Sequence, residues 1–177
     1  QVVVIGLLES AKDSQLEITQ LAYLLEGLFA PGPLVLGPVV PTVSDASRSA
    51  RAALSANSVA STTSFSHRPI LADELLPERA LAGDSLAKQT LLTSLYYPIA
   101  DASTELLGTL RAYLECGRSL EATSKVLFVH ANTVRYRLRR IQEILGEDAT
   151  SPRTAFVLQV ALALGAISDS ESGVKRD

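Results

Sequence analysis

Residues 119–145 read SLEATSKVLFVHANTVRYRLRRIQEIL, and this stretch decides the fold of the C-terminal part of the chain. Ser119 is a typical N-cap, so it predicts a short helix that begins directly after it. Residues 128–130 predict a tight turn. A longer helix is predicted from about Ala131 to Leu145, because glycine at 146 is a common helix stop. The stretch therefore predicts two consecutive helices joined by a short turn.

The longer helix has one apolar side. Its apolar residues recur at steps of four, three and four: Val134, Leu138, Ile141 and Leu145. Polar side chains fill the remaining surface: Asn132, Arg135, Tyr136, Arg139 and Glu143 lie off the stripe, and Arg137 and Arg140 flank it. A short helix, a tight turn and a basic amphipathic helix form a helix-turn-helix, whose second helix fits the major groove of B-DNA.

The formal net charge of −3 conceals an uneven distribution. Residues 1–102 contain six basic and ten acidic side chains, whereas residues 118–142 contain six basic side chains and a single acidic one, Glu121. A local cationic region attracts phosphates even on an acidic protein, because screening limits the field of each charge to about 8–10 Å. A solvated helix face has the same composition, so charge alone leaves both interpretations open.

Further helices are expected on both sides of this stretch. Ser103 or Thr104 caps a helix that ends near Gly117, and Ser151-Pro152 begins a final helix. We therefore expect an all-α domain over residues 103–167. Residues 168–177 are polar and predict a disordered tail.

The N-terminal part has a different pattern. Short apolar runs predict strands over residues 2–8 and 34–40, and a third within 69–76. Helices are predicted between them: one from Ser14, one from Ser44 or Asp45 with Ala50, Ala53 and Leu54 on its apolar side, and two over 77–82 and 84–97, with a loop over 57–66.

These elements predict an α+β chain: a small, partial α/β domain over residues 1–98, followed by an all-α helix-turn-helix bundle. The boundary is expected at Pro98–Asp101. So few strands make an incomplete sheet unless upstream residues or a partner chain complete it.

Composition excludes several classes of protein. A single cysteine, Cys116, excludes a disulfide framework and a cysteine-ligated zinc site. With two histidines in the chain, few side chains are present that could bind a metal or form a catalytic triad. His67 lies beside two serines, but no glycine-flanked serine elbow accompanies it, so no catalytic residue, metal or cofactor is predicted. The apolar runs are too short to span a membrane and no secretion signal is present. A chain that opens at Gln1 without methionine is expected to be a fragment.

Residues 127–141 (LFVHANTVRYRLRRI) resemble the C-terminal DNA-binding domain of PucR/CdaR-type bacterial transcription regulators. Residues 110–114 (LRAYL) and the helix over 158–164 are similar to the same family, so the resemblance covers roughly residues 103–167. The segment before it resembles, more loosely, the degenerate GGDEF-like domain of these regulators. No GGDEF sequence occurs, which implies a scaffold rather than a cyclase.

The resemblance implies a cytoplasmic transcription regulator, often an activator, with a signal-sensing module upstream. Double-stranded DNA is the expected partner, and a homodimer or higher homo-oligomer is the expected assembly. The operator and the effector are not readable from the sequence. The alternative is a non-catalytic interaction or dimerisation module whose basic face binds an acidic protein.

Roles for individual residues follow from DNA chemistry. Asn132 and Arg135 are the candidates for reading bases, since asparagine suits adenine and arginine suits guanine. His130 is a candidate helix cap or phosphate ligand. The candidates for phosphate contact are Thr133, Tyr136, Arg137, Arg139 and Arg140. Structural roles remain open at this point: Asn132 and Thr133 also suit free amides at a helix start, and Tyr136 also suits packing.

Overall fold

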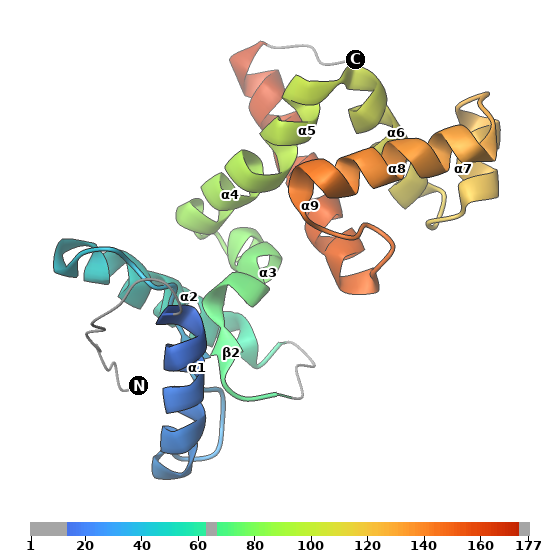
Figure 1. The fold of residues 1–177 in the computed structure, drawn as a ribbon. Helices are drawn as coiled ribbons and strands as arrows, with labels where there is room; N and C mark the ends of the chain where they lie inside the picture. Colours follow the sequence, from blue (N-terminus) through green and yellow to red (C-terminus); the bar gives the residue numbers. More distant parts are fainter. Residues whose placement is uncertain (1–13, 63–66, 174–177) are drawn as a thin grey trace. The chain divides into compact units, whose positions relative to one another are not determined.

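A computed structural model describes residues 14–62 and 67–173 of the chain. The described residues are mostly helical and form two compact units, residues 1–87 and 88–177 (Figure 1). The first unit contains α1 (Ser14–Leu25), α2 (Ala46–Ala60) and α3 (Leu76–Leu81), with single turns of 3-10 helix at Glu26–Leu28, Val43–Asp45 and Ala72–Leu75. α4 (Ser85–Leu91) begins in the first unit and ends in the second.

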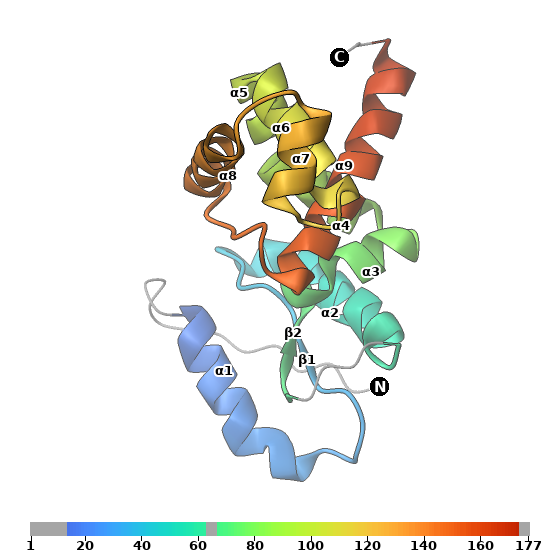
Figure 2. The same ribbon diagram turned by 90° about the vertical axis from the view of Figure 1, so that its right-hand side faces the viewer.

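Two short strands pair in the first unit, and Figure 2 shows them side by side. β1 (Val35–Leu36) runs parallel to β2 (Ile70–Leu71), with Val35 opposite Ile70. Within the predicted stretch 34–40 only Val35 and Leu36 pair. The next residue, Gly37, approaches α2 closely: a Cβ there would lie 2.4 Å from the carbonyl oxygen of Ser49. The strand predicted within 69–76 is found, and the one over 2–8 lies outside the described residues.

α2 is longer than the sequence predicted. The loop expected from residue 57 is wrong up to Ala60, where the helix ends. Its buried residues are Ala52, Ala56, Val59 and Ala60, which pack against Ile70 and Leu75. The predicted apolar side was also wrong, since Leu54 is 39% exposed. Alanine fits a close-packed helix contact and an exposed surface equally well, so an alanine-rich helix specifies its buried face weakly.

A buried ion pair lies in the same unit. Arg79 is 1% exposed and donates two hydrogen bonds to the Asp84 carboxylate, at 2.9 and 3.0 Å, and one to the Ala72 carbonyl at 3.0 Å. The other Asp84 oxygen accepts from the backbone N–H groups of Leu86 and Ala87 at the start of α4. Because both charges are paired and hydrogen-bonded, the cost of burying them is offset.

The described residues of the second unit form helices joined by short turns, with no strand among them. After a π-helical turn at Leu92–Tyr96 this unit contains α5 (Tyr97–Ala102), α6 (Thr104–Glu115), α7 (Leu120–Val126), α8 (Ala131–Leu145) and α9 (Pro152–Ser172). Ile99 and Ala100 pack into one core with Leu107, Ile141 and Leu158. The boundary predicted at Pro98–Asp101 therefore falls inside the second unit rather than before it. A proline in the first turn of α5 needs no N–H partner there, so it begins a helix instead of separating domains.

The last helix also corrects a prediction. A disordered tail from residue 168 is wrong as far as Ser172, because α9 continues to that residue and ends at Gly173, whose φ is 69°. The Tyr96 hydroxyl donates to the Asp169 carboxylate at 2.5 Å, and the Tyr97 hydroxyl lies 3.0 Å from that of Ser168. These contacts between positions over 70 residues apart hold a polar helix end that has no local apolar pattern. Residues 174–177 lie outside the described part of the chain.

Candidate nucleic-acid interface

α7 begins as the sequence predicted. The Ser119 hydroxyl accepts the Ala122 N–H at 3.2 Å, and the buried Thr123 hydroxyl donates to the Ser119 carbonyl at 2.7 Å. Glu121 lies in the first turn, where a negative charge is favourable to the helix dipole. α7 packs against both α6 and α8, which fixes the angle at which α8 leaves the turn (Figure 1).

The predicted turn over residues 128–130 is confirmed and has a Schellman geometry. The Val129 N–H donates to the Ser124 carbonyl at 3.0 Å, and the Phe128 N–H donates to the Lys125 carbonyl at 3.4 Å. Phe128 has a φ of 53°, and its side chain is 95% exposed. An aromatic residue therefore occupies the left-handed position that glycine usually fills.

His130 caps α8. Its Nδ1 accepts the Asn132 backbone N–H at 3.1 Å, so the neutral ring carries its proton on Nε2, which is left to donate outward. At the other end of α8 the Gly146 N–H donates to the Gln142 carbonyl at 2.8 Å. Both predicted ends of the helix are confirmed.

The predicted seam faces the core. Val134 and Ile141 are fully buried, and Leu138 and Leu145 are partly buried against the same core. Four of the predicted site residues lie together on the opposite, exposed side of the helix: Asn132, Arg135, Tyr136 and Arg139. Tyr136 is 70% exposed, so most of its side chain faces solvent rather than the core. These four side chains form what we call the outer face of α8.

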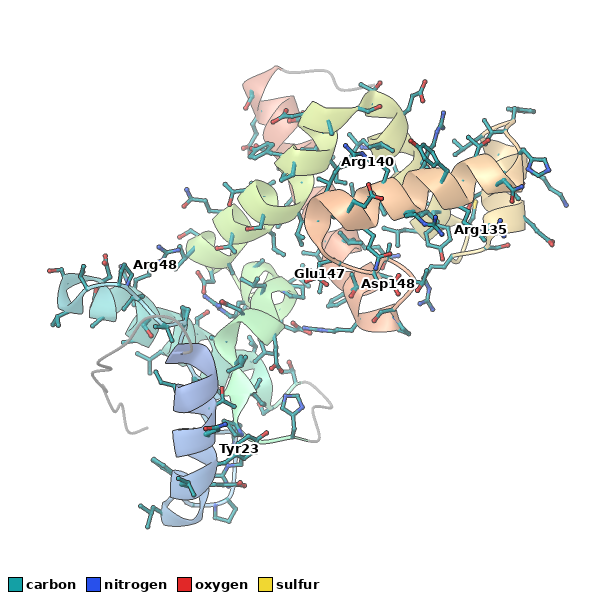
Figure 3. The ribbon with its side chains drawn as sticks, in the orientation of Figure 1. Tyr23, Arg48, Arg135, Arg140, Glu147 and Asp148 are labelled. Atoms are coloured by element: carbon teal, nitrogen blue, oxygen red, sulfur yellow. The ribbon has the colours of Figure 1, made fainter. Side chains whose placement is uncertain are left out.

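The two predicted base readers touch each other. The guanidinium of Arg135, which is labelled in Figure 3, donates to the Asn132 side-chain oxygen one turn earlier. This contact holds both groups near the N-terminal end of α8, where a helix in the major groove approaches base edges. Thr133, beside them in the first turn of α8, is only partly exposed.

Arg137 is placed differently from the other arginines of α8. Its guanidinium donates to the Glu105 carboxylate at 2.7 Å and to the Thr109 hydroxyl at 3.2 Å, both on α6. Its side chain is 19% exposed, against 56% for Arg140. Arg137 thus ties α8 to α6, and no sequence signal links it to a carboxylate 32 positions away.

The other charged side chains of α7 and α8 determine the electrostatic potential around the outer face. Arg140 pairs with Glu143 at 2.8 Å, and this hydrogen bond raises the pKa of Arg140. Within residues 14–62 and 67–173, Lys125, Arg135 and Arg139 have no carboxylate within salt-bridge distance. Their three positive charges therefore remain uncompensated, which is the arrangement that a phosphate backbone needs.

Two further features are absent from the described residues: a metal-binding cluster and a membrane-spanning helix. No group of three or more His, Cys, Asp or Glu side chains is arranged there to hold a metal ion. The described helices also include none with the length and apolar character needed to cross a membrane.

Comparison with known families decides the nature of the motif. Residues 106–164 match the PucR C-terminal helix-turn-helix domain. The matched region covers most of α6, all of α7 and α8 and the greater part of α9, and it includes every predicted site residue. The expected resemblance over residues 103–167 is thereby confirmed for the helix-turn-helix part.

Three relatives extend this similarity. An uncharacterized protein of Mycobacterium tuberculosis is 49% identical over 140 residues, which cover 79% of this chain and 34% of the relative. The purine catabolism regulatory protein of Bacillus subtilis is 44% identical over 59 residues, 33% of this chain and 11% of that protein. The crystal structure of a regulator of polyketide synthase expression from Bifidobacterium adolescentis aligns with a TM-score of 0.74 at 42% identity, covering 84% of this chain and 59% of that one.

The chain thus spans about a third of the length of its mycobacterial relative. The relatives whose names state a role are named as regulators or as a transcriptional activator and not as enzymes, in agreement with the expectation from the sequence.

Proposed function

We propose that this chain is the DNA-binding end of a PucR-type transcription regulator and that α8 is its recognition helix. The outer face of α8 carries the proposal: it presents Asn132, Arg135, Tyr136 and Arg139 to solvent, while the opposite seam is locked in the core. Two uncompensated guanidiniums on this face suit a polyanion. An α-helix has the width of the major groove.

The residues of the interface divide into three roles. Asn132 and Arg135 read base edges. Tyr136, Arg139, Arg140, Thr133 and the outward nitrogen of His130 contact phosphates. Arg137 holds α8 in place through Glu105, which replaces the phosphate contact expected from the sequence.

The rest of the regulator is proposed from the resemblance. The first unit serves as a degenerate GGDEF-like scaffold or dimerisation domain, and a segment outside this chain senses the signal. Two copies of the chain then read paired half-sites about one helical turn, roughly 34–36 Å, apart. The protein acts in the cytoplasm as an activator.

One experiment separates this proposal from an interaction module for an acidic protein. The 177-residue chain is used to select duplexes from a random pool, and its affinity for the selected duplex is compared with that for a scrambled duplex and for heparin. We expect the selected duplex to bind at least tenfold more tightly than either. Equal affinity for all three would refute sequence-specific DNA binding and favour the acidic partner.

A further inference from the structure

The α7–α8 turn contains a side chain that the fold does not use. Phe128 is 95% exposed, the most exposed large apolar side chain among the described residues. Burial of a phenyl ring contributes about 1.5–3 kcal/mol to stability, and almost none of that is obtained here. The ring instead presents apolar surface to water.

The backbone at Phe128 adds a second cost. In residues 14–62 and 67–173 seven residues have a positive φ, and five of them are glycines. The other two are Arg118 and Phe128. Arg118 makes use of its position, because its guanidinium donates to the Thr150 carbonyl at 2.9 Å. Phe128 gains no such contact, so glycine would suit this fold better on both counts.

The surroundings of Phe128 indicate what it contacts. It lies three residues before α8 begins and two before the cap His130. The exposed Lys125 lies three residues before it on α7, and the helix that follows, α8, carries the exposed Arg135 and Arg139. Glu121 at the far end of α7 is the single acidic residue between positions 118 and 142. An exposed ring beside uncompensated cations favours a polyanion that also carries apolar groups, and this describes duplex DNA.

We infer that Phe128 is a specificity-determining residue that contacts the 5-methyl group of a thymine at the edge of the major groove. This inference rests on the proposed function. A phenyl ring has no hydrogen-bonding group, so it reads a base pair only through apolar contact, and the thymine methyl is the apolar group that bases present in the major groove.

The test combines two variants with a modified duplex. In a duplex selected by the wild-type chain, thymines are replaced one at a time by deoxyuridine, which removes only the methyl group. We expect one position at which this replacement weakens wild-type binding by about fourfold, the value for one buried methyl group. Phe128→Ala should bind the thymine duplex more weakly and lose the sensitivity to deoxyuridine at that position.

Phe128→Gly separates a role in binding from a role in folding. Glycine relieves the left-handed backbone, so its Tm should rise by a few degrees while its affinity for the selected duplex falls. If Phe128 stabilised the fold, its replacement by glycine would lower the Tm instead. Ile167→Ala is the matched control, because Ile167 is an exposed apolar side chain, 57% accessible, on α9 of the same unit. It should leave affinity unchanged.

Two results would overturn the inference. The first is a Phe128→Ala variant that binds as tightly as the wild type, and the second is one that weakens all duplexes evenly while keeping the deoxyuridine sensitivity. Failure of the proposed function is distinguishable from both, because the wild-type chain would then show no preference for any duplex.

Discussion

The Arg137 guanidinium on α8 lies 2.7 Å from the Glu105 carboxylate on α6, and it also donates to the Thr109 hydroxyl at 3.2 Å. Thr109 is fully buried and its hydroxyl donates to the Glu105 carbonyl at 2.6 Å. α8 is therefore held by an apolar seam on one side and a polar tie beside it. Its outer face remains exposed to solvent.

The polar tie predicts a specific phenotype. Arg137→Ala should weaken DNA binding by loosening α8, yet leave the slope of log affinity against log salt unchanged, because no phosphate contact is lost. Glu105→Gln should have a similar but smaller effect, since an exposed carboxylate contributes about 0–1 kcal/mol. Titrations at several salt concentrations measure both. A slope reduced by about one unit in Arg137→Ala would assign the guanidinium to a phosphate instead.

The cap at His130 predicts a partial rescue. His130→Ala should lower the free energy of unfolding by about 0.5–2 kcal/mol, while His130→Asn should restore most of it, because asparagine is a strong N-cap. Thermal or urea unfolding checks this part. If the outward Nε2 contacts a phosphate, His130→Asn should still bind DNA more weakly than the wild type. If His130→Asn recovered the full affinity for DNA as well as the stability, His130 would act as a helix cap and not as a phosphate ligand.

Gly165 predicts a packing defect. A Cβ at this position would lie 2.3 Å from ring atoms of Tyr96, which is buried and hydrogen-bonded to Asp169 and so has little room to move. Gly165→Ala should lower the free energy of unfolding by about 1–3 kcal/mol through overpacking. Gly108→Ala is the matched control, because Gly108 lies in α6 with no atom within 4 Å of a Cβ. It should be neutral or stabilising by up to about 1 kcal/mol. The same sign for both variants would contradict this account.

Asp84 predicts how stability depends on pH. Its burial favours the neutral acid, but hydrogen bonds from Ser55, the Ala87 N–H and Arg79 outweigh that effect and lower its pKa. A lowered folded-state pKa adds stability above the unfolded value of about 3.9, and this stability is lost as the pH falls through the folded value. Stability should therefore decline below about pH 4.

Asp84→Asn removes that contribution and checks its origin. It should lower the free energy of unfolding by about 1–3 kcal/mol at pH 7 and make the decline in acid shallower. Asp73→Asn is the comparison, since Asp73 lies 3.6 Å from the same guanidinium but is 59% exposed. It should lower the free energy of unfolding by less than Asp84→Asn does. Urea unfolding between about pH 3 and pH 7, which extends into the acid range where the decline is expected, measures both. Parallel curves for Asp84→Asn and wild type would contradict the assignment.

The sequence predicted the helix-turn-helix well, because its signals are local. Ser119, the seam from Val134 to Leu145 and Gly146 each act within a few residues of their position, and the structure has the helix ends where they indicate. Features that depend on distant partners were not predictable. The tie of Arg137 to Glu105 and the ordering of α9 by Tyr96 both join segments far apart in the chain.

The first unit shows the opposite case. An alanine-rich α2 gives little contrast between its faces, so neither its buried side nor its end at Ala60 followed from the pattern. Phe128 was placed in the correct turn, but its significance emerges only from its φ and its exposure together. An aromatic residue at a position that favours glycine was the available signal.

The most direct test of α8 as a recognition helix compares Arg135→Ala with Arg139→Ala on the selected duplex and its single-base variants. Arg135→Ala should cost about 1–3 kcal/mol and relax the preference at one base pair, whereas Arg139→Ala should weaken all duplexes alike and reduce the salt slope by about 0.9. Arg48→Ala is the control, because Arg48 is an exposed arginine on α2 of the first unit (Figure 3). This variant should change neither the affinity nor the salt slope. Equal, sequence-independent losses from Arg135→Ala and Arg139→Ala, or no loss from either, would contradict the account.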